Sequence, residues 1–292
     1  GDFGESLLIT VLRRQRQQAL SAGSKDGLGL WDLEGREFST SLARGLDQVH
    51  CIDVCWRQLL CLAGQSCRLV LWDLARDQRL GCYEHGPSLL SHSVEWSNME
   101  VLSCCHAGEI HLWNLKTFET MKALSTKVAV RCMVVDWLSR RVVTCGERMS
   151  LWTVDALSKV RDFDLGAVGE VSAVALQWPR CVSAGKGLKL WTFPSESCES
   201  FRSRIEAPVL CLAASWAEER LVSGAADGTL RLFSLATRQM ILEFQGHRSE
   251  VLSISLHWPS GRILSGEDSS RLKLWGLERH PEPKAFKVQE LQ

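Results

Sequence analysis

Hydrophobic and polar residues alternate along this chain in short runs that recur at a nearly constant interval. Near the C-terminus the runs are RQMILEF at 238–244, VLSISLHW at 251–258, RILSG at 262–266 and RLKLWGL at 271–277. Clusters of Gly, Ser, Asp and Glu separate them at hairpin distances. Because a period of two residues is typical of β-strands, each interval predicts four short antiparallel strands.

A Trp marks the third run of most intervals. Successive markers lie 39 to 42 residues apart, which is the period of a four-stranded propeller blade. Phe233 fills the one gap in the Trp series. We therefore predict an all-β fold, a seven-bladed β-propeller of four-stranded antiparallel blades, with residues 1–292 as a single domain. The seven third-strand markers are Trp31, Trp72, Trp113, Trp152, Trp191, Phe233 and Trp275.

A second Trp series lies 13 to 17 residues before the first and confirms its register. Neighbouring blades must bury their faces on each other, because no helix covers them. A large ring at each marker position fills the wedge between two blades and buries about 150–250 Å². The second series consists of Trp56, Trp96, Trp137, Trp178, Trp216 and Trp258.

The two ends of the repeat array depart from the regular pattern. The run LLITVLRRQRQQAL at 7–20 has the Arg and Gln content of a helix, but LSAGSKDGLGLWDL follows it in the common register, so strands are expected. KAFKVQEL at 284–291 alternates weakly after a Pro-containing connector. We expect it to form the outer strand of the seventh blade, and the first and seventh blades to dock and complete the ring.

Two dipeptides carry a resemblance to a known family. Trp-Asp stands at Trp31-Asp32 and Trp72-Asp73, and Gly-His stands at Gly246-His247. Together with the marker spacing, they resemble the WD-repeat (β-transducin-type) propeller family over essentially the whole chain.

The resemblance implies a buried hydrogen-bonded network in each blade. It links a His before the first strand, a Ser or Thr of the second strand, the marker Trp and an Asp in the following turn. No blade has all four, since the seventh has Ser269 at the Asp position and the sixth has Phe233 at the Trp position. The structural residues implied are His247, Ser265, Trp275, His85, Ser223 and Asp227.

The resemblance also implies where a partner docks. In such propellers partners bind the face formed by the segments that lead into the first strands and by the turns after the second strands. The side chains there have mixed charge, and none is the aromatic that a methyl-lysine cage needs. The partner-binding candidates are Asp47, Gln48, Lys127, Glu170, Glu206, Arg248 and Glu250, with the turn residues Lys25 and Ala226.

Composition narrows the partner class. The 34 basic residues equal the 34 acidic ones, so no overall field attracts nucleic acid or an anionic membrane. No apolar run approaches the 18 residues or so that span a bilayer. The 12 Cys include no CxxC pair, and several lie inside apolar runs. They are expected to be reduced core thiols of an intracellular protein, cytoplasmic or nuclear.

Motifs of catalysis and metal binding are sparse. Ser183 and Lys186 satisfy SxxK, but in a predicted strand turn rather than at the helix start where that motif acts. His106 and His111 lie near Cys104 and Cys105, yet turn and strand side chains should diverge, so no metal or other cofactor is expected.

Charged pairs offer little more. The acidic pairs 218–219 and 267–268 are interpreted as solvated turn residues. The basic spots at 13–16 and 140–141 lie at predicted turns without interleaved aromatics, which disfavours a phosphopeptide or nucleic-acid site.

The prediction from sequence is a non-enzymatic scaffold that binds a protein or peptide partner on one propeller face within a larger assembly. An alternative is a recognition or regulatory propeller of a multidomain enzyme, such as a ubiquitin-ligase subunit. A weaker alternative is a propeller hydrolase, which would need a central metal or converging carboxylates. Fold alone does not decide among these alternatives.

Overall fold

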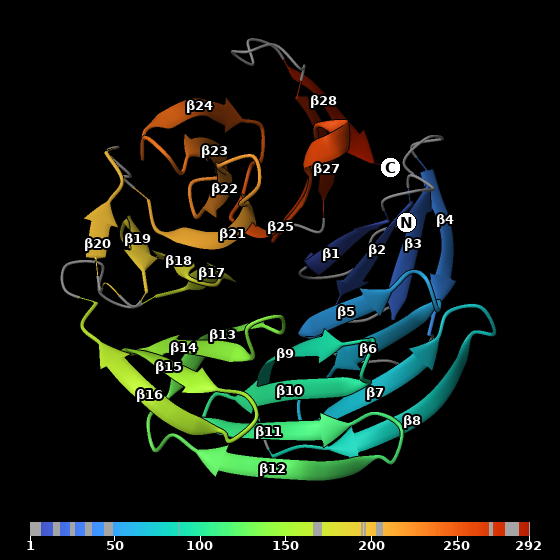
Figure 1. Ribbon diagram of the computed structural model, residues 1–292. Coiled ribbons are helices and arrows are strands. Elements are labelled where there is room, and N and C mark those ends of the chain that lie inside the picture. The colour runs from blue at the N-terminus through green and yellow to red at the C-terminus, as the bar shows by residue number, and fades with distance from the viewer. Residues whose placement is uncertain are drawn as a thin grey trace. The chain divides into compact units, whose positions relative to one another are not determined.

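The fold consists almost entirely of short β-strands (Figure 1). The computed structural model describes residues 7–13, 18–23, 27–32, 37–43, 49–86, 88–165, 171–193, 195, 197–202, 207–268, 271–277 and 286–291. In these ranges one short 3-10 helix, η2 (Trp258–Ser260), accompanies the strands. No helix among them has the length and apolar character needed to cross a membrane.

The chain divides into two compact units, residues 49–199 and residues 1–48 with 200–292. The unit of residues 49–199 holds the second to fifth blades. Their strands are β5 (Cys51–Cys55), β6 (Leu60–Gly64), β7 (Arg68–Asp73) and β8 (Gln78–Glu84); β9 (Leu89–Glu95), β10 (Glu100–Cys105), β11 (Glu109–Asn114) and β12 (Glu119–Ser125); β13 (Val130–Asp136), β14 (Arg141–Gly146), β15 (Met149–Thr153) and β16 (Ser158–Phe163); and β17 (Ala173–Gln177), β18 (Arg180–Ala184), β19 (Leu188–Thr192) and β20 (Ser197–Ser200).

The other unit holds the first, sixth and seventh blades. Their strands are β1 (Leu7–Arg13), β2 (Gln18–Gly23), β3 (Leu28–Asp32) and β4 (Glu37–Leu42); β21 (Val209–Ser215), β22 (Arg220–Ala225), β23 (Thr229–Ser234) and β24 (Met240–Gln245); and β25 (Val251–His257), β26 (Arg262–Glu267), β27 (Leu272–Leu277) and β28 (Phe286–Leu291).

Each blade is a meander in which consecutive strands pair antiparallel. All seven markers lie on third strands, from Trp31 on β3 to Trp275 on β27. In five blades the pairing of the third and fourth strands shifts register next to the marker, as between Leu112 and Trp113. Such bulges increase the local twist of a strand. Seven sheets of this order make the fold an all-β, seven-bladed β-propeller, as predicted.

The marker Trp residues pack between successive blades. Trp152 lies in a buried cluster with Leu102 and Ile110 of the preceding blade. Trp191 packs in the same way with Val143. The predicted wedge-filling role of the markers is therefore confirmed, and truncating one to Ala is expected to cost about 3–5 kcal/mol.

Each Trp of the second series directly follows a first strand, and two of these Trp residues bond to the preceding blade. The indole N–H of Trp96 donates to Asp53 Oδ1 (3.1 Å), and that of Trp137 donates to Ser93 Oγ (2.9 Å). These bonds tie neighbouring first strands together in the unit of residues 49–199.

The strands expected at the chain ends are confirmed, whereas completion of the ring stays a prediction. Residues 7–13 and 18–23 form β1 and β2 rather than a helix. Residues 286–291 form β28, which pairs with β27 as the fourth strand of the seventh blade. β1 lies beside β25 and β26, so the first and seventh blades are in contact within their unit. Whether residues 1–292 form a single domain stays a prediction.

Candidate functional site

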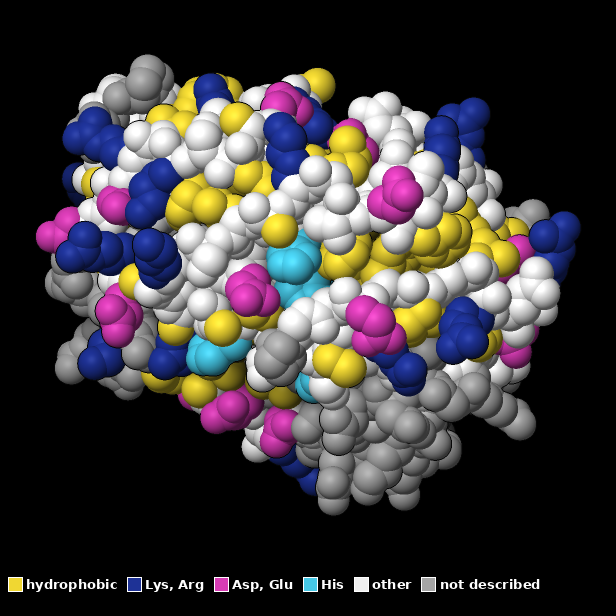
Figure 2. Space-filling view, turned by 90° about the horizontal axis from the view of Figure 1, so that it is seen from below, with side chains coloured by type: hydrophobic (Ala, Val, Ile, Leu, Met, Phe, Trp, Pro, Cys, Tyr) yellow, Lys and Arg dark blue, Asp and Glu magenta, His cyan; other side chains and the backbone are white. Residues whose placement is uncertain are grey.

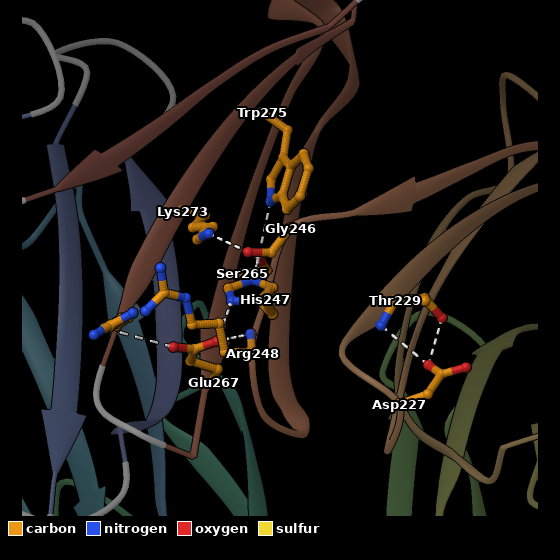
Figure 3. A network of polar contacts seen from close by, with 10 residues as sticks. Asp227, Thr229, Gly246, His247, Arg248, Ser265, Glu267, Lys273 and Trp275 are labelled. Atoms are coloured by element: carbon orange, nitrogen blue, oxygen red, sulfur yellow. Dashed lines mark hydrogen bonds and ion pairs between the residues drawn. The ribbon is translucent and has the colours of Figure 1, made fainter.

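The seventh blade contains a buried polar network of four side chains (Figure 3). Ser265 Oγ on β26 accepts a hydrogen bond from Trp275 Nε1 on β27 (2.7 Å) and lies 2.6 Å from His247 Nε2. His247 Nδ1 lies 2.9 Å from Glu267 Oε2. The side chains of His247 and Glu267 are fully buried. The network joins β26 and β27 to the segment that leads into β25.

Glu267 corrects the interpretation made from sequence. The pair 267–268 was expected to be solvated in a turn, but β26 continues through Glu267, whose side chain is 0% exposed. Its Oε2 also accepts the backbone N–H of Arg248 (2.9 Å), and Arg271 Nε lies 3.9 Å from Oε1. These partners offset the cost of burying a carboxylate. Glu267 thus supplies the acid that is missing at the family's Asp position.

The bond between the marker Trp and a second-strand hydroxyl recurs in other blades. In each case the indole N–H donates over 2.7 to 2.9 Å, and the hydroxyl is buried. Ser183 belongs to this set, so its SxxK motif has a structural explanation. The pairs are Trp31 with Ser21, Trp113 with Ser103, Trp152 with Thr144, Trp191 with Ser183 and Trp275 with Ser265.

The sixth blade keeps the hydroxyl but loses its donor. Ser223 Oγ is fully buried and has no hydrogen-bond partner among the described residues, because Phe233 stands where the other blades have an indole. Asp227, predicted at the acid position, instead accepts the backbone N–H of Thr229 (3.0 Å) and pairs with Arg231 (2.8 Å). Arg231 also pairs with Glu243 (2.8 Å). The Arg231 side chain is buried while the two carboxylates remain partly exposed, and the sequence analysis did not predict this ion-pair cluster.

His85 does not reproduce the role of His247. Its Nδ1 lies 3.3 Å from the adjacent Gly86 carbonyl oxygen, and its buried Nε2 has no partner among the described residues. The rings of His85, His111 and Trp113 contact one another, with centroids 4.6 Å apart for His85 and His111, 5.2 Å for His111 and Trp113, and 6.1 Å for His85 and Trp113. Burial lowers the pKa of both imidazoles, so a cluster of uncharged rings stands in place of the expected strand-linking bond.

At the end of the blades where partners were expected to dock, the turn between the second and third strands packs against the segment that leads into the next blade's first strand. Gly228, in the turn between β22 and β23, has φ +76°, and a Cβ there would meet the His247 carbonyl oxygen at 2.8 Å. The turn therefore lies against the segment that carries Arg248 and Glu250. Both side chains are exposed, while the Arg248 backbone is held by Glu267.

The same arrangement recurs within the unit of residues 49–199. Gly108, with φ +87°, lies between β10 and β11, and a Cβ added there would clash with the Val128 carbonyl oxygen. Lys127 is exposed on this segment, one position before Val128, which is itself 44% exposed. Each described candidate is thus placed at the expected end of its own blade.

The remaining candidates lie outside the described residues. They are Asp47, Gln48, Glu170, Glu206 and the turn residue Lys25. Ala226 is described and half-buried, with its N–H donating to the Pro208 carbonyl oxygen (2.9 Å).

One Cys–His contact has the composition of a nucleophilic pair but not its chemistry. Cys51 Sγ lies 3.0 Å from His92 Nδ1, and His92 Nε2 lies 3.1 Å from the Leu62 carbonyl oxygen. Burial raises the pKa of Cys51 to about 12 and lowers the pKa of His92 to about 4. Both groups are therefore neutral near pH 7, whereas a nucleophile requires a thiolate.

The other cysteines and histidines form no metal centre in the described part of the chain. No group of three or more His, Cys, Asp or Glu side chains there could hold an ion. His106 is exposed and binds the Val130 carbonyl oxygen through Nδ1 (2.9 Å), whereas His111 stacks on Trp113. All 12 cysteines are free thiols, and six of them are buried.

Comparisons with known proteins agree with this architecture. The family described as "WD domain, G-beta repeat" matches residues 197–234 and 238–276, which include the sixth and seventh markers. The WD-repeat resemblance is thereby confirmed, and the matched WD40 repeats contain third strands of the sixth and seventh blades.

Three relatives show how far the similarity extends. The chain is 24% identical to a serine-threonine kinase receptor-associated protein of Gallus gallus, over 76% of this chain and 65% of that protein. It is 28% identical to autophagy-related protein 16 of Arabidopsis thaliana, over 55% of this chain and 33% of that protein. A kinesin-like protein of Mus musculus is 34% identical over 27% of this chain and 5% of its own length. The matches thus span less than two thirds of each relative.

Proposed function

We propose that this chain is a non-enzymatic platform that binds a protein or peptide partner within a larger assembly. The partner docks at the end of the blades where the segments before the first strands meet the turns after the second strands. The observation that carries this proposal is the fixed presentation of Arg248. Its backbone N–H is bonded to the buried Glu267, while its side chain and that of Glu250 are exposed.

Such presentation favours binding on physical grounds. A side chain with an ordered backbone loses less entropy on binding than one on a mobile loop. Arg is also enriched among the few residues that dominate interface energy. The mixed charge of the candidate residues at this end fits the balanced net charge of the chain. Figure 2 shows a different view, in which basic, acidic and apolar side chains are likewise interspersed.

The proposed setting is intracellular, either cytoplasmic or nuclear. Twelve unpaired cysteines are typical of a reducing compartment. Nucleic acid and membranes are not proposed as partners, since neither a net basic charge nor a spanning segment supports them.

A double variant tests the docking site. Arg248→Ala/Glu250→Ala should leave folding nearly intact, because exposed substitutions usually change stability by no more than about 0.5 kcal/mol. Affinity purification with mass spectrometry should show loss of a partner that the wild type retains. The control is Glu218→Ala/Glu219→Ala in the turn between β21 and β22, at the other end of the sixth blade. Unchanged capture by the first variant, or equal loss in the control, would contradict the site.

The second candidate is a recognition domain within a multidomain enzyme. The observation that favours it is the length of the relatives, each of which extends beyond the part that matches this chain. The mass and catalytic activity of the full-length protein would distinguish the two candidates.

A further inference from the structure

The hairpin between β13 and β14 presents an unusually exposed aliphatic side chain. Leu138 is 95% exposed, more than any other large hydrophobic residue in the described ranges. Asp136 Oδ1 accepts the backbone N–H groups of Leu138 (3.0 Å) and Ser139 (3.3 Å), which fixes the turn. Leu138 is therefore held out toward solvent by an ordered backbone.

The first arginine of this hairpin has its charge neutralised. Arg140 pairs with Glu100 of the preceding blade (2.6 Å) and with Asp155 of its own blade (2.6 Å). Its guanidinium also lies over the Trp137 ring, 5.4 Å from the centroid. Arg140 therefore acts as a structural clamp between two blades and leaves no net positive charge for a ligand.

The second arginine is unpaired. The Arg141 guanidinium lies over Trp178 of the next blade, 5.4 Å from the ring centroid, and makes no hydrogen bond or ion pair with any described residue. Trp178 is fixed by its backbone N–H, which donates to Asp136 Oδ2 (2.7 Å), and by stacking of its ring on Phe193, with centroids 5.5 Å apart. Arg141 is thus oriented by an aromatic ring while its N–H donors remain available. The sequence places Trp178 in the second Trp series but did not show that its ring lies beside Arg141 of the preceding blade.

We propose that Leu138, Arg141 and the edges of Trp137 and Trp178 form a second docking surface, for an acidic peptide segment with a large apolar side chain. The partner's carboxylate would pair with the edge of the Arg141 guanidinium, which matches a carboxylate in geometry. Its apolar side chain would pack on Leu138. Trp and Arg are the residues that most often dominate the energy of such contacts.

The charge arrangement favours one carboxylate over a polyanion. A nucleic acid would need several free cations to contact its phosphates, but in this described hairpin only Arg141 is unpaired, and Glu100 and Asp155 stand close to Arg140. Arg140 lies over the Trp137 ring, and Arg141 and Phe193 lie against the Trp178 ring, which leaves less ring surface for stacking a base. A short acidic segment with few charges fits these conditions better than RNA does.

This surface is separate from the one in the proposed function. Lys127 precedes β13 and Leu138 follows it, so a strand of seven residues, about 20 Å, lies between the two ends. Variants at one end can therefore fail without affecting the other.

Selection from a phage library of random 12-residue peptides, on immobilised whole protein, tests the proposal. Selected peptides should carry an Asp or Glu close to a Leu, Ile or Phe. Fluorescence anisotropy with the synthetic peptides should show binding weakened at least about tenfold by Leu138→Asp and by Arg141→Glu. Arg141→Gln keeps most of the stem over Trp178 and should weaken binding in the same direction.

Three control variants establish whether the peptides bind at this surface. Arg148→Glu reverses a charge at the opposite end of the same blade, and Met121→Asp removes another exposed hydrophobic side chain. Both should bind as the wild type does, as should Arg248→Ala/Glu250→Ala. The proposal would be overturned if no acidic peptides were enriched, or if the Leu138 and Arg141 variants bound them as tightly as the wild type does. Displacement of the peptides by a single-stranded RNA oligonucleotide would also overturn it. Circular dichroism of every variant verifies folding.

Discussion

The same serine position has opposite surroundings in the sixth and seventh blades, and this difference predicts opposite effects on stability. Ser265 Oγ bonds both Trp275 Nε1 and His247 Nε2, and both partners are buried. Ser223 Oγ is buried and bonds to no described residue. Replacing each by Ala removes the same atom from the same strand position of two adjacent blades.

The expected magnitudes follow from the number of polar groups left without a partner. Ser265→Ala removes the bonding partner of the buried Trp275 indole N–H and of His247 Nε2, at about 1–3 kcal/mol each, so a loss of about 2–6 kcal/mol is expected. Ser223→Ala breaks no bond and removes an unsatisfied hydroxyl. Its effect should lie within about 0.5 kcal/mol of the wild type or be stabilising.

Equilibrium unfolding in urea, followed by Trp fluorescence, measures both variants. The transition midpoint should fall clearly for Ser265→Ala and stay level or rise for Ser223→Ala. Equal losses, or a larger loss for Ser223→Ala, would refute the argument that hydrogen bonding distinguishes the two blades.

Three further predictions concern other parts of the molecule. Gly108→Ala should destabilise by more than about 1 kcal/mol, because φ is +87° and backbone atoms occupy the Cβ position, whereas Gly187→Ala, with open space, should be nearly neutral in thermal melts. The pKa of buried His92 is lowered to about 4 in the folded protein, whereas the same imidazole in the unfolded chain is protonated below about pH 6.5. Stability should therefore fall as pH drops from about 6.5 to about 4, and His92→Gln should flatten part of that slope in melting temperatures. A thiol reagent should label the exposed Cys67 and Cys198 first, and labelling of most of the 12 thiols without denaturant would contradict the buried assignments.

The fold could be predicted from sequence because its main determinant repeats. Marker spacing and the two-residue period fix the blades whatever residue fills any one position, so Phe233 did not disturb the register. The helical composition of residues 7–20 was overridden for the same reason, since pairing with the neighbouring strands outweighs local propensity.

The buried network could be predicted only in part. His247, Ser265 and Trp275 match family positions, but Glu267 was assigned to a turn because acidic residues are normally exposed. A usable signal was the strand period, which places residue 267 on the same side as Ser265. The orientation of His85 could not be inferred, because it depends on the ring of His111 from another strand.

The surroundings of the proposed docking residues were the least predictable feature. Sequence placed Lys127, Arg248 and Glu250 at strand ends, but it could not show that Glu267 holds the backbone of Arg248. The stacking of Arg141 on Trp178 was also hidden, because it joins two blades through residues that lie far apart in the sequence.

Site-specific photocrosslinking tests the central claim most directly. A benzophenone amino acid at position 248, and separately at position 218, would be activated in cells and its products identified by mass spectrometry. Docking at the proposed end predicts a specific crosslinked partner from position 248 and none from position 218. A partner crosslinked from position 218 but not from position 248 would contradict the proposed docking end.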